Sequence, residues 1–249
     1  MQISRMAGAA IPASSVFPDL EPTEPSATIQ AEPRAVHPRL RVVPDQAERR
    51  SALAPRAHVL SFANMQLFGD LWANFMRARK SVFVDRLHWS LPVEEGMEFD
   101  QYDTPHARWV VIHEFGEVLA GVRLTPTTSK VGLHSYMLRD AQLGLLPDIP
   151  RDVLFFEAPV EKRIWEATRL FIVDEVAAER RLAVQTALMS NFASAARAEG
   201  ATHVIGIVPA VWSRWLRRLD MGAVPVGPRF SIDGTRSQAA LFNVIKQAL

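Results

Sequence analysis

Cysteine is absent from this chain of 249 residues, which excludes disulfide-stabilised scaffolds, thiolate metal sites, iron–sulfur clusters and cysteine nucleophiles. An excess of charge of one sign is also missing, because 28 Lys and Arg oppose 27 Asp and Glu and leave a formal net charge of +1. So weak a net charge does not indicate nucleic acid as the main partner. No run approaches the roughly 18 apolar residues that span a bilayer, so we expect no membrane partner.

The sequence also lacks the short motifs that mark many active sites. It contains no glycine-rich nucleotide loop, no GxSxG, no HExxH and no EF-hand loop, and its seven His show no helical ligand spacing. We therefore expect no metal. The first residues make a poor secretory signal, because Pro12 interrupts their short apolar patch. Together with the absence of Cys, this predicts a cytoplasmic protein.

Proline is distributed unevenly and divides the chain. Eight of the 17 Pro fall in the first 55 residues, a stretch without any sustained apolar period. Such a segment does not bury enough surface to offset the chain entropy lost on folding. We predict a Pro-rich flexible N-terminal extension over residues 1–58 and a single folded domain over residues 59–249, which is long enough to bury a full core.

The first half of this domain alternates between helical and extended patterns. Apolar residues between Phe62 and Phe83 recur at helical spacing and predict one or two amphipathic helices. A polar loop follows over residues 90–105. The β-rich runs 107–114 and 118–125, separated by three residues that include a glycine, predict an antiparallel hairpin. A short helix is expected at 136–143.

The last third predicts strands at 163–173, 202–208 and 242–245, with helices at 179–199 and 210–219 between them. Gly200 follows the first of these helices as an expected C-cap. A strand–helix–strand unit behind an antiparallel hairpin indicates an α/β fold, a mixed central sheet flanked by helices. One face of the helix is expected to be apolar: Leu182, Val184, Leu188, Phe192 and Ala196.

Charged side chains are unusually dense between Glu98 and Asp103, where three carboxylates fall within six residues. One interpretation is a solvated acidic turn beside ordinary surface arginines. Against it, Arg123 and Arg169 lie in β-rich runs, where a charge is disfavoured unless it faces solvent or finds a partner. Glu166 and Arg169 are three apart on a predicted strand, so they point to opposite faces unless a bulge intervenes.

The order and spacing of these residues resemble a known family. The series is Arg79-x3-Phe83-x5-Trp89-x8-Glu98-x-Asp100-x2-Asp103, followed by GVRLTPT at 121–127 and WEATR at 165–169. It resembles the acyl-homoserine-lactone synthases, the autoinducer synthases of bacterial quorum sensing, over roughly residues 65–230 with every charged motif position filled.

This resemblance implies an N-acetyltransferase-like fold, in which two parallel strands, here 168–173 and 202–208, splay apart to admit an acyl-pantetheine arm. It also implies a reaction. The α-amine of S-adenosylmethionine is acylated by an acyl thioester, and the methionyl carboxylate then closes the lactone and expels methylthioadenosine. S-adenosylmethionine is thus a substrate and no cofactor is implied. The donor is either an acyl carrier protein or acyl coenzyme A, and no obligate protein partner is predicted.

The residue roles follow from the resemblance and from what the chemistry needs. A carboxylate base must deprotonate the amine, with Glu98 as first choice and Glu166 as second. Carboxylates suit a cationic substrate and an aromatic face suits its sulfonium or adenine. The catalytic set is Glu98, Glu166, Arg123 and Arg169, and the substrate-binding set is Arg79, Phe83, Trp89, Asp100 and Asp103.

Two further sets concern the acyl donor. An acyl pocket is expected between the splayed strands and the helix that joins them, and a basic patch is expected to dock the carrier protein. The pocket candidates are Phe171, Val173, Leu188, Phe192, Val204 and Ile207; the docking candidates are Arg180, Arg181, Arg214, Arg217 and Arg218. The alternatives are another N-acyltransferase of the same superfamily and a catalytically silent module that binds an acyl ligand or carrier protein.

Overall fold

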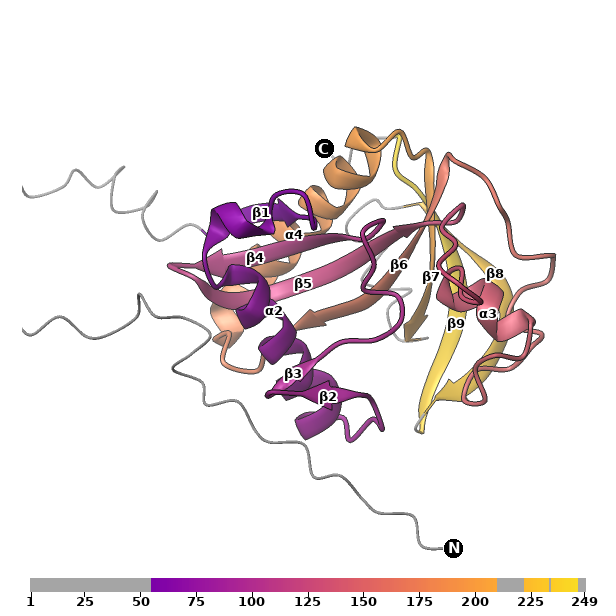
Figure 1. The fold of residues 1–249 in the computed structure, drawn as a ribbon, viewed down its shortest axis with the longest axis horizontal. Helices are drawn as coiled ribbons and strands as arrows, with labels where there is room; N and C mark the ends of the chain where they lie inside the picture. Colours follow the sequence, from indigo (N-terminus) through magenta and orange to yellow (C-terminus); the bar gives the residue numbers. More distant parts are fainter. Residues whose placement is uncertain (1–54, 210–221, 233, 246–249) are drawn as a thin grey trace, which may run out of the picture. The chain divides into compact units, whose positions relative to one another are not determined.

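A mixed seven-stranded sheet forms the centre of the described part of the chain, with the strand order β1-β4-β5-β6-β7-β9-β8 (Figure 1). The computed structural model describes residues 55–209, 222–232 and 234–245. β6 and β7 run parallel, and every other neighbouring pair of this sheet is antiparallel. The strands are β1 (Arg56–Leu60), β4 (Arg108–Glu114), β5 (Glu117–Pro126), β6 (Ile164–Ile172), β7 (His203–Pro209), β8 (Ala223–Ile232) and β9 (Thr235–Asn243).

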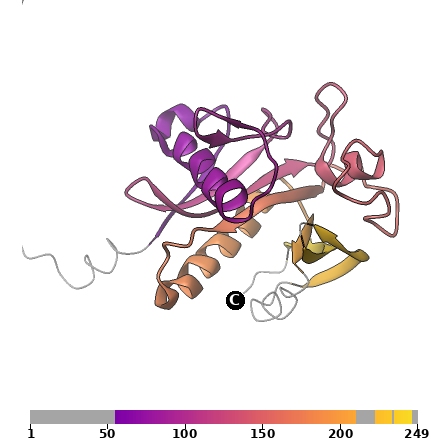
Figure 2. The ribbon, with the colours of Figure 1, turned by 90° about the horizontal axis from the view of Figure 1, so that it is seen from below.

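Helices cover both faces of this sheet (Figure 2). α2 (Leu71–Arg79), which continues into a π-helical turn at Lys80–Arg86, and α3 (Met137–Gln142) lie on one face, and α4 (Ala178–Ala198) crosses the other. A small hairpin of β2 (Val93–Glu94) and β3 (Met97–Glu98) packs beside α2. The α/β fold expected from the sequence is confirmed.

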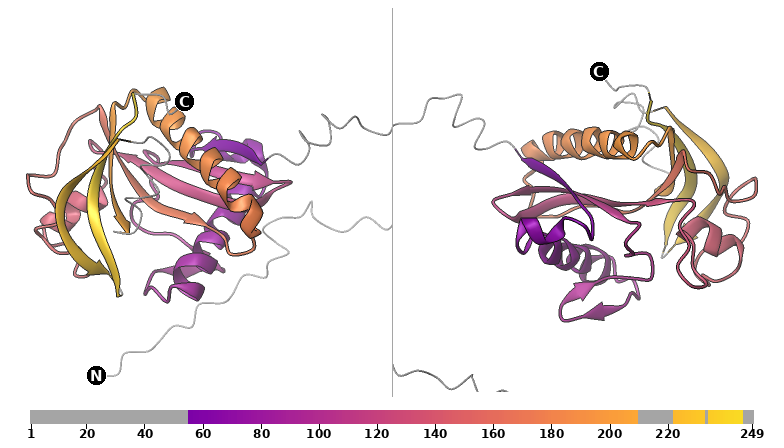
Figure 3. Two further views of the ribbon diagram at one scale, coloured as in Figure 1. Left: turned by 180° about the vertical axis from the view of Figure 1, so that it is seen from behind. Right: turned by 45° about the horizontal axis from the view of Figure 1, so that its top comes forward.

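α4 shows why the sequence specifies this packing. The helix packs along one face of the sheet (Figure 3). Val184, Leu188, Phe192 and Ala196 recur at helical spacing and are all buried. Gly200 adopts a φ of 81° just beyond the helix, as expected of a glycine C-cap. Leu182 does not belong to the buried face, because it is 66% exposed near the start of the helix.

β6 contains a bulge that brings two charged residues to one face. Arg123 of β5 pairs with Thr168, whereas Gly121 pairs with Phe171, so β6 has one extra residue between these pairs. Arg169 lies in the bulge and adopts a φ of 53°, which is strained for a residue with a side chain. The bulge turns the Arg169 side chain to the α2 face, the face that also receives Glu166.

The two parallel strands are paired over only part of their length. Register runs from Ile164↔His203 to Ala167↔Gly206, beyond which β6 and β7 have no further pairs with each other. Gly206 marks the last close approach, because a Cβ there would lie 2.6 Å from the Ala167 carbonyl oxygen. Beyond the Ala167↔Gly206 pair, the rest of β6 pairs with β5, and the rest of β7 pairs with β9.

Three sequence expectations need correction or lie outside the described residues. β1 begins at Arg56, inside the range assigned to the N-terminal extension, and pairs with β4 throughout. The closing strand expected at 242–245 is instead the end of a long hairpin, β8 and β9. The helix expected at 210–219 falls outside the described residues, as do residues 1–54.

Apolar side chains form two clusters on the sheet. The larger cluster contains the buried apolar residues of α2, α4 and the central strands. The smaller cluster gathers around α3, β7 and the β8–β9 hairpin. Within the described residues, no helix is long and apolar enough to cross a membrane.

Candidate active site

A closed ring of buried ion pairs lies between α2 and the sheet. Each of its three arginines contacts two carboxylates, and each of its three carboxylates contacts two arginines. In ring order the members are Arg79, Glu98, Arg169, Asp100, Arg123 and Asp103, and we call them the ion-pair ring. The acidic run is therefore not a solvated turn, and its charges cancel within the ring.

Arg79 joins the last turn of α2 to the hairpin and loop that follow. Its Nε donates to Glu98 Oε2 at 2.6 Å, and its Nη1 and Nη2 donate to both Asp103 oxygens at 2.7 and 3.0 Å. Arg79 and Glu98 are fully buried. A bidentate guanidinium–carboxylate pair fixes orientation as well as distance, so α2 and the acidic loop are held in one register.

Arg123 ties the acidic loop to the sheet. From β5 its Nη1 contacts Asp100 Oδ1 at 2.5 Å and Asp103 Oδ1 at 2.9 Å, while its Nε donates to Thr168 Oγ1 at 2.9 Å. Its side chain is completely buried. The charge that was unexpected in a β-rich run is thus explained by the two carboxylates that face it.

Arg169 closes the ring from the bulge in β6. Its Nη2 lies 3.2 Å from Glu98 Oε1 and 2.8 Å from Asp100 Oδ2. The same guanidinium stacks 5.5 Å from the Phe83 ring centre and 6.0 Å from that of Trp89. Its side chain is 8% exposed, whereas those of the other two ring arginines are 0% exposed. Arg169 therefore marks the accessible edge of the ring.

The ring strongly favours its ionised state. Burial alone would raise the pKa of Asp103, but Arg123 and Arg79 lower that pKa below its ordinary value. Asp100 shows the same direction, with burial opposed by Arg123 and Arg169. Burial disfavours the charged form of Arg123, yet its two carboxylate partners raise its pKa. The three arginines and three carboxylates have formal charges that cancel, so they form an electrically neutral platform.

Glu166 is a different kind of carboxylate. It is buried in β6 and accepts backbone N–H bonds from Met137 at 2.9 Å and Leu138 at 2.7 Å, at the start of α3. Among the described residues, Glu166 has no ion-pair partner, and both of its hydrogen-bond donors are neutral backbone groups. Burial raises the pKa of Glu166 to about 7, although the two backbone donors and Arg123 act in the opposite direction. A carboxylate that gains and loses a proton near neutral pH is suited to general base catalysis.

A buried polar network that the sequence analysis missed adjoins Glu166. Asp140 Oδ2 accepts the Tyr102 hydroxyl at 2.9 Å and lies 2.9 Å from His134 Nδ1. Its Oδ1 accepts the Ser135 backbone N–H at 3.0 Å. Tyr102 lies within the acidic motif and could have been suspected, but nothing in the sequence connects Asp140 to it across 38 residues.

The expected acyl-pocket residues are divided between the two faces of the sheet. Leu188 and Phe192 of α4 and Val204 of β7 belong to the larger cluster. Ile207 packs instead against the smaller cluster, on the side that carries Glu166. Phe171 and Val173 are buried, with the Phe171 ring 5.5 Å from Phe75 of α2.

The structure describes two of the five arginines that were expected to dock the carrier protein. Arg180 pairs with Glu114 of β4, and Arg181 donates to the Asp174 carbonyl oxygen at 3.1 Å. Arg214, Arg217 and Arg218 lie outside the described residues.

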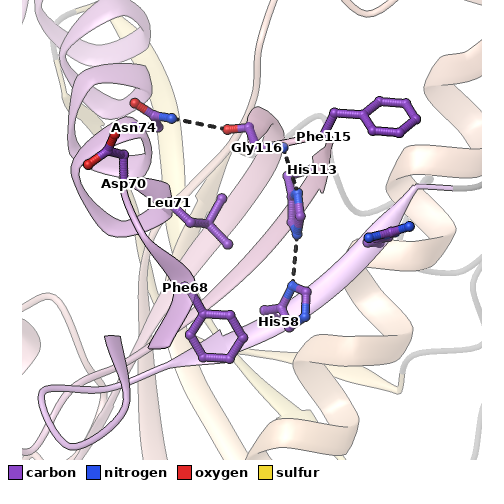
Figure 4. A pocket seen from close by; sticks show the side chains of 9 residues that line it. His58, Phe68, Asp70, Leu71, Asn74, His113, Phe115 and Gly116 are labelled. Atoms are coloured by element: carbon purple, nitrogen blue, oxygen red, sulfur yellow. Dashed lines mark hydrogen bonds between the residues drawn. The ribbon is translucent and has the colours of Figure 1, made fainter. Parts of the chain in front are cut away.

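A concave region of about 380 Å³ lies away from the ring, at the turn of the β4–β5 hairpin (Figure 4). His58 Nδ1 is 2.8 Å from His113 Nε2, and His113 Nδ1 accepts the Gly116 N–H at 3.2 Å. Burial, with His58 and Arg56 nearby, lowers the pKa of His113. No ring residue lines this region. Among the described residues, no group of three or more His, Asp, Glu or Cys is arranged to hold a metal ion.

Known proteins are similar to this chain in both sequence and fold. The family model described as autoinducer synthase matches residues 66–247. An acyl-homoserine-lactone synthase of Acinetobacter nosocomialis is 31% identical over 181 residues, which cover 70% of this chain and 92% of that protein.

Solved structures agree with these matches. The coenzyme A-dependent acyl-homoserine lactone synthase BjaI, solved with S-adenosylmethionine and isopentyl-CoA, aligns with a TM-score of 0.63 and 25% identity over 79% of this chain and 86% of its own. An acyl-CoA N-acyltransferase from Pseudomonas aeruginosa shares the fold, with a TM-score of 0.50 and 16% identity over 76% of this chain and 99% of its own.

Proposed function

The chain belongs to the autoinducer synthase family and is an acyl-homoserine-lactone synthase, and we propose that Glu166 and the ion-pair ring carry its reaction. The enzyme acylates the α-amine of S-adenosylmethionine with an acyl thioester, after which lactone closure releases methylthioadenosine. The observation that supports this assignment most directly is a buried carboxylate of near-neutral pKa beside a pre-formed charged platform. The lactone product implies a role in quorum sensing.

Glu166, rather than Glu98, is the base in this proposal. Both Glu98 oxygens already accept charged donors, from Arg79 on one side and Arg169 on the other, and protonation would break these pairs. Each Glu166 oxygen accepts one neutral backbone donor and keeps a further lone pair. Glu166 therefore accepts the amine proton at the lower cost, and Glu98 serves to orient the two arginines.

The accessible edge of the ring is suited to S-adenosylmethionine. Arg169 uses Nε and Nη2 in the ring, and its Nη1 donates to no other described residue, so this group is available to the methionyl carboxylate. Trp89 and Phe83, 5.0 Å apart between ring centres, offer an aromatic surface to the sulfonium or adenine. Asp100 has the most exposed of the three ring carboxylates and faces the same edge.

The thioester is proposed to enter where β6 and β7 diverge. Arg169 and Leu170 have no register partner on β5, and their strand has no pairing with β7 beyond Ala167. Backbone N–H groups at such a bulge are suited to the developing charge on the thioester oxygen. The acyl chain then extends over the smaller cluster, which includes Ile207 and lies on the Glu166 side of the sheet. Leu188, Phe192 and Val204 are core residues in this proposal.

We further propose that the acyl donor is an acyl carrier protein or coenzyme A thioester and that the enzyme is cytoplasmic. An acyl carrier protein would use the basic patch named above, whereas coenzyme A would need no protein surface. A cytoplasmic location would supply S-adenosylmethionine and acyl thioesters together.

The test incubates the purified full chain with S-adenosylmethionine and two matched panels, acyl carrier protein thioesters and coenzyme A thioesters. We expect methylthioadenosine and one dominant acyl lactone by mass spectrometry, with Glu166→Gln as the low-activity control. An acylated product without lactone would indicate a different N-acyltransferase. Thioester binding without either product would indicate a silent binding module.

A further inference from the structure

Asp140 is a buried carboxylate for which the reaction described above gives no role. It is fully buried in α3, and its one ion-pair partner among the described residues is His134, an imidazole that is partly exposed. Its other contacts are neutral donors, the Tyr102 hydroxyl and the Ser135 N–H. Burying a carboxylate without a permanent cation is costly, so a carboxylate at this position calls for a specific explanation.

The contacts of Asp140 join the two parts of the proposed site. Tyr102 stands between Asp100 and Asp103, so its hydroxyl connects Asp140 to the loop that supplies two members of the ion-pair ring. Asp140 itself belongs to the helix whose first two N–H groups bind Glu166. One carboxylate thus fixes the separation between the ring and the proposed base.

We propose that Asp140 is a positioning residue, which places α3 against the acidic loop through Tyr102 and adds its negative charge to the surroundings of Glu166. This inference rests on the proposed function of Glu166 as the base. Asp140 touches neither substrate nor reacting atoms in it. Its effect passes through the helix and through the electric field at Glu166.

The charges around Glu166 support this direction. Burial is the main cause of the raised pKa of Glu166, the backbone donors and Arg123 lower that pKa, and Asp140 raises it. Burial, together with Glu166 and Asp140, raises the pKa of both Tyr102 and Tyr136. The titratable and charged groups around Glu166 are therefore Arg123 of β5, Tyr102 of the acidic loop, Tyr136 at the start of α3 and Asp140 within α3.

The decisive experiment measures the protonation of Glu166 without substrate. The full chain is labelled with ¹³C at glutamate carboxyl carbons, and the Glu166 signal is assigned by its loss in Glu166→Gln. In the wild type we expect a titration midpoint of about 7. Asp140→Asn should lower this midpoint by roughly half to one pH unit, because a like charge is removed. Asp140→Ser is a second charge-removing variant in case the first does not fold.

Two matched variants separate charge from geometry. Tyr102→Phe keeps the Asp140 charge but removes the hydroxyl contact, so kcat should fall about tenfold while the Glu166 midpoint shows no downward shift. Asp148→Asn makes the same chemical change at an exposed residue of the same segment and should alter neither quantity. Asp140→Glu, which restores the charge, should recover most of the midpoint.

The possible outcomes are distinguishable. A Glu166 midpoint that is unchanged in both Asp140→Asn and Asp140→Ser overturns the inference, even if the enzyme makes lactone. A wild-type midpoint near the ordinary glutamate value, or an absence of lactone, contradicts the proposed role of Glu166 instead.

Discussion

Replacing Glu166 by Gln tests the proposed mechanism most directly. Only the ionised carboxylate accepts the amine proton, so with a pKa of about 7 the ionised fraction rises roughly tenfold between pH 6 and pH 8. Wild-type kcat/KM should follow this rise, measured as methylthioadenosine release at saturating thioester. Glu166→Gln should reduce kcat by about 10²- to 10⁴-fold, the usual contribution of a positioned base, and its residual activity should lack the limb near pH 7.

The same substitution has a consequence for stability, with a definite sign. The folded pKa of Glu166 is about 7 and its ordinary value is 4.5, so between these pH values the folded chain holds a proton that the unfolded chain has lost. Stability from this group is therefore greatest at low pH, decreases as pH rises through that window, and is level above about pH 7. Gln does not titrate and removes this dependence.

The magnitude can be compared between the two proteins. The unfolding free energy of the wild type minus that of Glu166→Gln should fall by about 2–3 kcal/mol from pH 5 to pH 8, measured by urea unfolding. The backbone hydrogen bond that Glu166→Gln loses changes its unfolding free energy by the same amount at pH 5 and at pH 8. The ring carboxylates are the same in both proteins. Neither contribution therefore changes how the free-energy difference depends on pH. A difference that is constant with pH would show that Glu166 ionises normally, and retention of the acidic limb by the variant would exclude Glu166 as the base.

Three further predictions concern the ring and its aromatic edge. Glu98→Gln should lower stability because it leaves Arg79 and Arg169 short of a charge, but should keep the acidic limb near pH 7; loss of that limb would return Glu98 to the base role. Arg79→Met should cost about 3–5 kcal/mol in urea unfolding, whereas Lys80→Met, which removes an exposed pair with Asp85, should cost under about 1 kcal/mol; similar losses would contradict the buried ring. Trp89→Leu should raise the KM for S-adenosylmethionine about tenfold and leave the KM for the thioester unchanged, and Trp89→Phe should have an intermediate effect. An equal rise in both KM values would indicate that Trp89 has only a structural role.

Local pattern was sufficient for the elements whose packing is periodic. The β4–β5 hairpin and α4 carry their buried residues at strand and helix spacing, and both lie within a residue or two of their predicted bounds. β1 and the β8–β9 hairpin were missed or truncated. β1 follows a proline-rich stretch, and β8 contains Pro225 and Pro228, so their strand character depends on distant partners that a local window does not contain.

The site shows the same limit more sharply. The residue types and spacing of the motif grouped these charges into one proposed site, but did not predict that they close into a ring, because ring partners are up to 71 residues apart in sequence. The bulge at Arg169 decides the matter: without one extra residue in β6, the side chains of Arg169 and Glu166 would face opposite sides. A backbone irregularity of this kind leaves no periodic signal.

The proposed base changes from Glu98 to Glu166 for a related reason. At the sequence level Glu98 and Glu166 are two carboxylates near the same arginines, and proximity in the motif favoured Glu98. In the fold, Glu98 has a cation on each oxygen, whereas Glu166 has burial, two backbone donors and the negative charge of Asp140. Proton affinity is set by these surroundings and not by residue type. The proposed site needs two environments within one buried region: a charged ring and a carboxylate without a cationic partner. The second environment is formed by α3, which is not part of the motif.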